Sequence, residues 1–502
     1  MKTYLIIQAG GKGTRMYSNT WNRPKALISV LGKPIIVHLI NIFKSFRPII
    51  IGDYYFNKIK LSLKYTYDFK NNIYIETSKQ GSISGISDAL RYLKKNNPIL
   101  ISWCDLFFFK KPKFSKKINC ITIGVTDDFV CRYIVKNNII QINKNNLKKN
   151  GIIGLFYVPC KKLIANISEE GEFVEWLKKS QLRFKTKKIK SVFELGDNGK
   201  LELFREKFEN TRFFNSIRFK KKFIEKRSIV KKYNHLIKKE IYWYRKVYDK
   251  IPKNVPKLYK SKYIKIERIY GSSPSTCTKN KEKILLNIID ALKKLHSSSY
   301  VIASKQDLAL EYFNKTQNRV MSVSRFIPNF KNTIIKINNV NCKNYFSPEY
   351  KKDFFEITKS LYDTKQFNFI HGDPTFSNIL VEKDLNIKFI DPRGYFGNSK
   401  IYGDSRYDFA KLYYSIVGRF DNFNQKKFIL KNFNNNTEVY ILDNGWGDYS
   451  NIFNEFFKKD LESIKKIHAL IWLSLTGYTI DDYDSVLASF YNGIFLLNQL
   501  DQ

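Results

Sequence analysis

Cysteine is scarce in this chain, with six residues among 502, dispersed and without a C-x-x-C pair. This pattern fits neither a zinc site nor a disulfide framework, and it is typical of a reducing compartment. No apolar run approaches the roughly 18 residues that a transmembrane helix needs. Because an apolar strand begins within four residues of Met1, we also expect no signal peptide. The sequence therefore predicts a soluble, cytoplasmic protein without a transmembrane segment.

Acidic residues are few beside basic ones, with 45 Asp and Glu against 88 Lys and Arg and a formal net charge of +43. Such an excess indicates either a nucleic-acid or membrane-surface binder, or a lysine-rich protein with sites for anionic substrates. The lysines are scattered in short runs such as 220–222 and form no dense basic tail. Lysine also outnumbers arginine, the residue that dominates specific base recognition. We favour the second interpretation and expect no specific nucleic-acid partner.

The first 205 residues alternate between short β-rich runs and helical patterns. Strands are expected within residues 3–10, 47–56 and 98–109, and helices within 32–46 and 84–95. This alternation predicts an α/β domain with a doubly wound, Rossmann-like parallel sheet. Ligands of such a sheet bind at the carboxyl ends of its strands.

The pattern changes around residues 205–215. Antiparallel segments are expected within 216–227 and 257–271, on either side of a helix at 235–251. After residue 280 the chain is mostly helical, apart from two apolar strands. These are expected at 367–373 and 387–394. The Asn-rich stretch 431–438 is expected to be a surface loop. We therefore predict two domains, residues 1–207 and an α+β domain of two lobes over 212–502.

Three glycines, a lysine and an arginine lie in "QAGGKGTRM", residues 8–16, directly after the first apolar run. Glycines let backbone N–H groups approach phosphates, and the cations neutralise their charge. The stretch is neither a Walker A loop nor the dinucleotide fingerprint. With Pro24-Lys25, ten residues after Arg15, and a Gly-Lys-Pro that opens a helix, it resembles the sugar-1-phosphate nucleotidyltransferases and phosphocholine cytidylyltransferases.

This resemblance implies a role for several residues of the first domain. Arg15 would hold the β- and γ-phosphates of the nucleotide, and Lys25 would bridge its α-phosphate and the acceptor phosphate. Asp105 and Asp197 would bind Mg²⁺, although each could instead be a strand-end or helix-capping aspartate. The remaining nucleotide contacts would come from Ala9, Gly10, Gly11, Gly13 and Thr14 around the phosphates, and from Gln80 and Gly85 at a pyrimidine base.

A second motif, "FIHGDPTFSNILV", has the spacing H-x-D-x-x-x-x-N of a kinase catalytic loop, and "IKFIDPRG" follows it. It resembles the aminoglycoside phosphotransferase and choline kinase superfamily. The resemblance implies that Asp373 accepts the proton of the acceptor hydroxyl and that Asn378 and Asp391 bind Mg²⁺. Arg393 follows Asp391 by two residues. It could lie at the acceptor and disfavour a cation such as choline, or it could form a structural ion pair.

The upstream parts of this second site are less specified. Lys226 would pair with the ATP phosphates and with Glu240, and Lys222 and Glu225 compete for these roles. No clear glycine-rich loop precedes Lys226. His296 is expected to be a packed residue.

Together the two resemblances imply a bifunctional transferase. One domain phosphorylates a small hydroxylated metabolite with ATP, and the other transfers a nucleotidyl group to the phosphate ester from a second NTP, CTP or another pyrimidine NTP. An NDP-activated precursor of a bacterial capsule or surface polysaccharide is the expected product. An anomeric sugar kinase coupled to an NDP-sugar synthase is an alternative, and a non-catalytic basic nucleic-acid-binding protein is a rival of another class.

Overall fold

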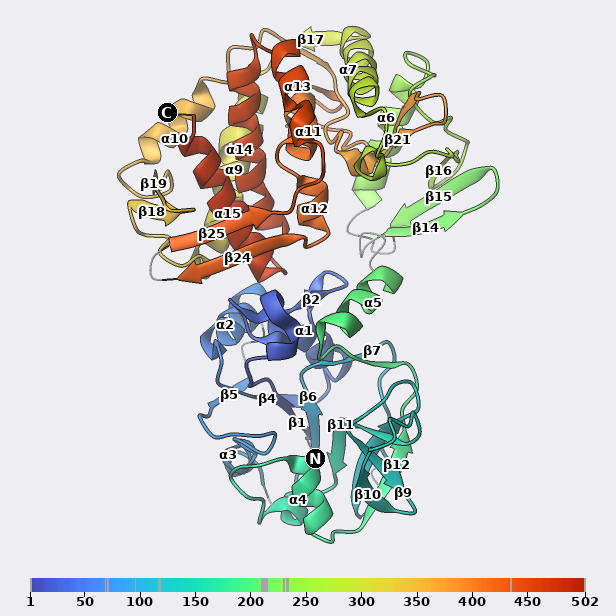
Figure 1. Cartoon of the computed structure of the whole chain (residues 1–502), viewed down its shortest axis with the longest axis vertical. Coiled ribbons are helices and arrows are strands. Elements are labelled where there is room, and N and C mark those ends of the chain that lie inside the picture. The colour runs from blue at the N-terminus through green and yellow to red at the C-terminus, as the bar shows by residue number, and fades with distance from the viewer. Residues whose placement is uncertain are drawn as a thin grey trace. The chain divides into compact units, whose positions relative to one another are not determined.

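The structure is a computed structural model that describes residues 2–67, 69, 72–94, 96–115, 119–208, 215–228, 231, 234–433 and 436–500. It divides into two compact units (Figure 1). The first contains residues 1–210 with 481–484, and the second contains residues 211–480 with 485–502.

The first unit is built on a nine-stranded sheet with the order β10-β9-β11-β6-β1-β4-β5, in which β8 also pairs with β11 and β12 pairs with β8. In register, Ile6 of β1 lies between Ile49 of β4 and Ile101 of β6. The strands of the sheet are β1 (Tyr4–Gln8), β4 (Arg47–Gly52), β5 (Ile73–Glu76), β6 (Ile99–Trp103), β8 (Ile121–Thr126), β9 (Tyr133–Lys136), β10 (Ile139–Ile142), β11 (Gly151–Val158) and β12 (Phe184–Lys188).

The expected parallel sheet is found only in part. Strands β6, β1, β4 and β5 run parallel, whereas β11 runs antiparallel to both β6 and β8. Between β8 and β11 the chain makes the β9–β10 hairpin in place of a crossover helix, so β11 returns in the opposite direction. The sheet is therefore mixed, with a Rossmann-like parallel part at its centre.

Helices cover both faces of this sheet (Figure 1). Because side chains alternate along a strand, Ile49 and Ile51 of β4 join the core under α3 and α4, whereas Ile50 joins the core under α1 and α2. The helices are α1 (Ile35–Ile42), α2 (Phe56–Leu61), α3 (Ile86–Arg91), α4 (Phe173–Lys179) and α5 (Asn198–Phe208). Smaller strands complete the unit: β2 (Ser29–Val30), β3 (Lys33–Pro34), β7 (Leu106–Phe108) and β13 (Val192–Glu194). The 3₁₀ segments η1 (Thr14–Thr20) and η2 (Lys25–Leu27) follow β1.

The second unit begins with an antiparallel sheet and one long helix, as expected. The sheet has the order β14-β15-β16, and α6 packs its buried Trp243 and Tyr244 inward. Figure 1 shows this sheet on one side of the unit and the main helices on the other. The elements are β14 (Asn215–Phe219), β15 (Phe223–Ser228), α6 (Asn234–Val247) and β16 (Ile264–Glu267).

The rest of the second unit is mainly helical, with buried strands that carry the second motif. Its helical elements are η6 (Pro274–Thr276), α7 (Lys281–Ser297), α8 (Lys305–Leu308), η7 (Ala309–Asn314), α9 (Lys315–Val323), α10 (Lys351–Lys359), η9 (Phe376–Asn378), α11 (Ser405–Ile416), α12 (Phe420–Asn424), α13 (Ser450–Phe456), α14 (Leu461–Tyr478) and α15 (Tyr483–Asn498). Short strands around them are β17 (Tyr300–Ile302), β20 (Gln366–Phe369), β21 (Ile379–Val381), β22 (Ile387–Phe389) and β23 (Tyr402–Gly403).

The Asn-rich stretch 431–438 is not the loop that the sequence indicates. Its described residues belong to a hairpin of β24 (Phe428–Phe433) and β25 (Asn436–Ile441), and residues 434–435 lie outside the described ones. β25 runs parallel to β18 (Ile334–Ile337), which pairs with β19 (Val340–Lys343). Buried Leu430 and Val439 are each followed or preceded by a polar residue in their strands. Asn436 forms hydrogen bonds with Asn339 of the neighbouring hairpin, so asparagines of this stretch help to hold the strands together.

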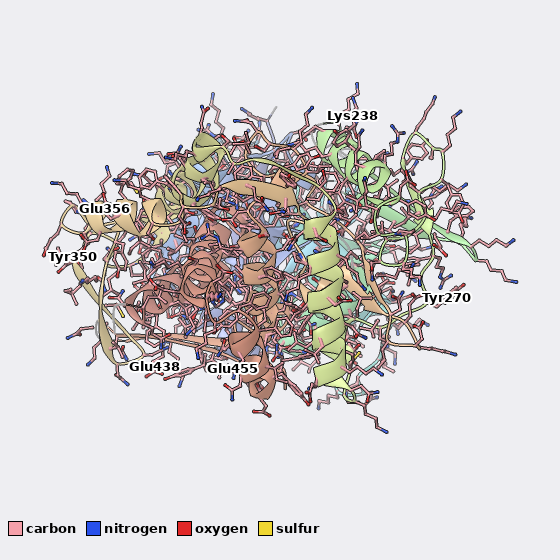
Figure 2. The ribbon with its side chains drawn as sticks, turned by 90° about the horizontal axis from the view of Figure 1, so that it is seen from above. Lys238, Tyr270, Tyr350, Glu356, Glu438 and Glu455 are labelled. Atoms are coloured by element: carbon pink, nitrogen blue, oxygen red, sulfur yellow. The ribbon has the colours of Figure 1, made fainter. Side chains whose placement is uncertain are left out.

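Charged side chains cover the second unit widely. In Figure 2, Lys238 of α6 extends away from the protein, and many nitrogen-tipped side chains do the same along its outline. Among the described residues, no helix combines the length and apolarity that membrane crossing requires.

Candidate active sites

The glycine loop follows β1 at the carboxyl end of the parallel strands. Gly11 and Gly13 have φ values of 96° and 60°, a left-handed conformation that glycine adopts without strain. The N–H of Gly11 donates to Asp53 Oδ1 at 2.9 Å, just beyond β4. Gly10, Gly11, Thr14 and Arg15 are exposed, whereas Ala9 is buried and its N–H bonds Ile51. The exposed loop thus presents backbone donors and a cation, and one of these donors already holds an anionic oxygen.

Lys25 and Asp105 form an ion pair across this end of the sheet. Lys25 Nζ lies 2.6 Å from Asp105 Oδ2, and the two side chains are 18% and 9% exposed. Burial disfavours the charged ammonium of Lys25 and would by itself lower its pKa. The nearby Asp105 carboxylate favours the ammonium, and the net result is a pKa above the ordinary value. The other oxygen of Asp105, Oδ1, is buried and accepts no hydrogen bond from any residue that the structure describes. A buried carboxylate oxygen of this kind is suited to a cation.

Glu194, at the end of β13, is a site residue that the sequence analysis missed. A side chain at Gly196 would meet carboxylate oxygens of both Glu194 and Asp105, which therefore face the same small space. Glu194 also acts on the charge of Lys25. The sequence did contain a signal for Glu194. This glutamate lies two residues before Gly196, and the lack of a side chain at Gly196 leaves room for its carboxylate.

Asp197 has the capping role that the sequence analysis left as an alternative. Its Oδ1 accepts the backbone N–H of Lys200 at 2.9 Å, in the first turn of α5. Lys200 Nζ lies 3.5 Å from Asp197 Oδ2 and also bonds Glu194. The structure thus brings Glu194 to Asp105 and uses Asp197 to begin a helix.

The segment expected at the nucleotide base lies beside the glycine loop. Gly85 has φ 75°, and a Cβ there would lie 2.5 Å from Ile51 Cγ2, so packing alone requires glycine. Gln80 is exposed, and its carbonyl accepts from Gly171 N at 3.1 Å. Gln8, which the sequence analysis did not single out, donates through Nε2 to the carbonyls of Ser82 and Ser84 at 2.8 and 2.9 Å. The end of β1 is thereby tied to this segment.

In the second unit, the chain between β20 and β21 carries the second motif. Asn378 Nδ2 donates to the carbonyl of Asp373 at 2.8 Å and to its Oδ2 at 3.1 Å. Lys411 of α11 was not foreseen, and its Nζ lies 3.0 Å from Asp373 Oδ1. Burial opposes the charge of Lys411, but Asp373 raises the pKa of the ammonium. Both oxygens of Asp373 are thus held by donors.

Lys226 lies between two carboxylates. Its Nζ is 2.8 Å from Glu240 Oε2, and it also bonds Asp391, which follows β22. Of the competing residues, Lys222 is exposed and Glu225 pairs in register with Lys265 of β16. The structure therefore brings together Lys226, Glu240 and Asp391. The stretch considered for a phosphate-covering loop lies partly outside the described residues, because 213 and 214 are not among them.

A buried network fixes the backbone of the motif. Asp408 accepts the N–H groups of His371 and Gly372 at 2.8 and 2.7 Å and contacts His296 Nε2 at 3.0 Å. Burial lowers the pKa of His371. The N–H of Asp373 donates to His371 Nδ1, and His371 Nε2 bonds the carbonyl of Ile390, an arrangement that fits the neutral ring. His296 is therefore a packed residue, as expected.

Arg393 forms the ion pair that the sequence analysis left as an alternative. Its guanidinium contacts Glu311 at 3.0 and 2.5 Å through two nitrogens. Burial disfavours the Glu311 carboxylate, yet Arg393 and then Lys315 hold its pKa well below the ordinary range.

Within the described part of the chain, no three His, Cys, Asp or Glu side chains form a metal-binding group. Carboxylates come together only in smaller sets in these two sites.

Comparison with known proteins gives one family and several relatives for the N-terminal part. Residues 5–131 match the MobA-like NTP transferase domain. The bifunctional protein GlmU of Methanocaldococcus jannaschii is 30% identical over 188 residues, which are 33% of this chain and 43% of that protein. GlmU of Buchnera aphidicola (subspecies Acyrthosiphon pisum) is 28% identical over 191 residues, or 35% of this chain and 39% of that protein. The chain thus spans less than half the length of these relatives.

Solved structures give matches of similar extent. CTP:phosphocholine cytidylyltransferase from Streptococcus pneumoniae is 20% identical, with a TM-score of 0.34, over 41% of this chain and 99% of that one. Inositol-1-phosphate CTP transferase from T. maritima is 19% identical, with a TM-score of 0.34, over 41% of this chain and 94% of that one. The family match confirms an NTP transferase domain in the N-terminal part.

Proposed function

We propose that the chain is a bifunctional transferase. The first domain, residues 1–207, transfers a nucleotidyl group from an NTP to a phosphorylated small molecule. The second domain, residues 212–502, makes that phosphate ester from ATP and a hydroxylated metabolite. The observation that carries the first step is the NTP transferase domain with its Lys25–Asp105 pair. The second step is carried by the Asp373, Lys226 and Asp391 arrangement.

In the first step, an oxygen of the acceptor phosphate attacks the α-phosphorus of the NTP. One P–O bond forms, the bond from the α-phosphorus to the bridging oxygen breaks, and pyrophosphate leaves. Two anions must meet, so cations and donors at the developing charge lower the barrier. The exposed Gly10, Gly11 and Arg15 are suited to the phosphates that leave. Lys25 would neutralise both reacting phosphates.

Mg²⁺ fits both sites on the chemistry of their oxygens. When bound, Mg²⁺ would neutralise phosphate charge, and such ions need only one or two protein carboxylates besides the phosphates. In the first domain we assign Asp105 and Glu194 to it, because Oδ2 of Asp105 and Oε1 of Glu194 face the same space beside Gly196, and Oδ1 of Asp105 accepts no hydrogen bond from the described residues. In the second domain we assign Asn378 and Asp391.

In the second step, the hydroxyl oxygen of the acceptor attacks the γ-phosphorus of ATP. The bond to the bridging oxygen breaks, ADP leaves, and the hydroxyl proton passes to the Asp373 carboxylate. Asn378 and Lys411 orient that carboxylate. Lys226, which Glu240 positions, is the cation for the ATP phosphates. The product would supply the first domain, and an activated precursor for a surface polysaccharide is the use that we propose.

The test is a mass-spectrometric screen of the purified full chain with ATP, the four NTPs and a panel of alcohols, sugars and their phosphates. We expect ADP and a phosphate ester from one class of acceptor, and pyrophosphate and an NDP-linked product from its ester. Lys25→Ala should abolish pyrophosphate release and keep phosphorylation, and Asp373→Ala should do the reverse. Loss of both activities in one folded variant would contradict two separate sites.

A further inference from the structure

Four cationic side chains gather around Asp373 and the segment that follows Asp391. We call Lys239, Lys315, Arg393 and Lys411 the cation cluster. Lys411 contacts Asp373 at 3.0 Å, and Arg393 and Lys315 share the carboxylate of Glu311. These residues come from α6, α9, α11 and the chain after β22, whereas Lys226 comes from β15.

Two tyrosine rings connect three of the four members of the cation cluster. The Tyr395 ring has Lys239 Nζ 3.8 Å and the Arg393 guanidinium carbon 4.1 Å from its centroid. The Tyr407 ring has Lys315 Nζ at 5.2 Å and the Arg393 guanidinium carbon at 5.7 Å. Arg393 Nη1 also donates to the Tyr407 hydroxyl at 3.4 Å. The cations therefore surround a common aromatic surface.

The acidity of these two tyrosines reports the sign of the local potential. Arg393 lowers the pKa of Tyr395 in spite of burial. At Tyr407, burial raises the pKa, but Lys315, Lys411 and Arg393 together outweigh it and lower the value. Buried Tyr414, whose ring centroid lies 5.2 Å from Lys411 Nζ, behaves differently, because burial and then Asp373 raise its pKa well above the ordinary one. The potential around Tyr395 and Tyr407 is thus positive.

Among the described residues, the carboxylates that contact this cluster or lie beside its contacts are fewer than its cations. Glu311 and Asp373 contact its members, and Asp307 lies beside them, where it accepts the N–H of Asn398 at 2.9 Å and the hydroxyl of Ser399. Three carboxylates therefore face four cations. The side chains of Lys315, Arg393 and Lys411 are 14–16% exposed and that of Asp373 is 22% exposed, so a ligand at Asp373 can reach this surface.

We propose that the acceptor phosphorylated at Asp373 carries, besides its hydroxyl, an anionic oxyacid group that the cation cluster binds. This inference rests on the kinase activity proposed above and adds the substrate class. An anion beside surplus cations gains charge-assisted hydrogen bonds, whereas a quaternary ammonium would be repelled. Arg393 contributes through its charge within the Glu311 pair, so it need not leave that pair.

The test compares acceptors that differ only in charge. The full chain with Mg²⁺ and ATP is assayed with glycerol, glycerate and glycerol 3-phosphate, with ribitol and ribonate, with glucose and glucuronate, and with choline. We expect kcat/KM for an acid to exceed that of its neutral partner by tenfold or more. Glycerate against glycerol 3-phosphate then distinguishes a carboxylate from a phosphate. Equal or faster turnover of the neutral partners or of choline would overturn the inference.

Lys239 and Lys238 offer a matched pair of variants on one helix. Lys238 is exposed and extends outward in Figure 2, whereas Lys239 lies over Tyr395. Lys239→Met should raise KM for the acid about three- to tenfold and leave KM for ATP and for neutral acceptors unchanged, and Lys238→Met should change none of these. A rise in KM for ATP alone would assign the cations to the nucleotide and overturn the inference.

Calorimetric titration of the full chain with the same compounds keeps the two proposals distinct. If no compound is phosphorylated, the kinase proposal fails. Acids that still bind tenfold more tightly than their neutral partners would support the anion site on its own. Acids that bind no more tightly would overturn it.

Discussion

At the scale of single residues, the contact between Lys25 and Asp105 joins stability to chemistry. Each side chain is mostly buried and neutralises the other, so neither can be removed without leaving a buried charge. The same two residues are those assigned to the reacting phosphates and to Mg²⁺. Loss of activity in a single variant could therefore reflect either loss of the fold or loss of the chemistry.

A double variant separates these effects. Lys25→Met alone should lower the free energy of unfolding by about 3 kcal/mol, the lower end for a broken buried pair because Lys25 is partly exposed. Lys25→Met with Asp105→Leu should recover most of that loss, because no unpaired charge remains, yet release no pyrophosphate. Urea unfolding and a pyrophosphate assay measure the two quantities. Recovery of activity in the double variant would remove Lys25 from the mechanism.

The choice between Glu194 and Asp197 as a carboxylate for Mg²⁺ can also be tested by substitution. Asparagine caps a helix as well as aspartate does, so Asp197→Asn should preserve α5 and change the Mg²⁺ dependence of the first activity little. Glu194→Gln keeps the size of the side chain and removes its charge. It should raise the Mg²⁺ concentration for half-maximal activity about tenfold or more. The opposite order would make Asp197 the ligand.

At the scale of elements, α14 carries a buried histidine that can only be neutral. Trp472 Nε1 donates to His468 Nε2 at 3.0 Å, one turn apart in the helix, and Tyr413 and Tyr414 pack on the ring. Burial lowers the pKa of His468 to about 3. In the unfolded chain a histidine titrates near 6.5. Between about pH 3 and 6.5, the unfolded state therefore binds one proton more than the folded state does.

Stability should therefore fall as the pH falls below about 6.5. From pH 7 to pH 5 the neutral His468 alone should cost about 2 kcal/mol of unfolding free energy. His468→Gln, which can still accept the Trp472 N–H, should remove this part of the pH dependence. Urea unfolding at both pH values measures the difference, and equal slopes in wild type and His468→Gln would contradict it.

Elements with strong local signals were predictable, and those that depend on distant partners were not. The apolar strand before Gly10 and the amphipathic α6 were visible because their patterns are local. The direction of β11 and the pairing of β25 with β18 depend on strands far along the chain, which periodicity does not specify, and the β24–β25 hairpin was missed because its asparagines are typical of a loop. In the sites, the two resemblances pointed to Lys25, Asp105, Asp373, Asn378 and Asp391, whose roles stay predictions, and the structure brings Lys25 to Asp105 and Asn378 to Asp373. Glu194, Glu311 and Lys411 escaped, because only the fold brings them to those residues.

At the scale of the whole molecule, charge is spread over the surface. The formal net charge of +43 comes from lysines on many elements, and the outline in Figure 2 shows such side chains extending in many directions. The cation cluster near Asp373 accounts for only a small part of this charge. The remaining lysines add a positive electrostatic potential, but they are not arranged to bind one particular ligand.

Binding to duplex DNA should therefore be weak and non-specific. We expect it to fall steeply with salt and to vanish near physiological ionic strength, because scattered lysines supply only counterion release. Filter binding of two unrelated duplexes over a range of salt concentrations measures this. Sub-micromolar, sequence-dependent binding at physiological salt would instead indicate a nucleic-acid-binding protein.

The parallel pairing of β18 with β25 has a consequence for biosynthesis. Lys336 and Ile337 pair with Asn436 and Thr437, so the second strand leaves the ribosome about 100 residues later. At the usual pace of translation this delay lasts about 5–20 s. During that time the β18–β19 hairpin has one edge without its partner strand. Its turn at Asn338 and Asn339, both with positive φ, lets the hairpin close locally, and Lys336 on the waiting edge discourages pairing with another nascent chain.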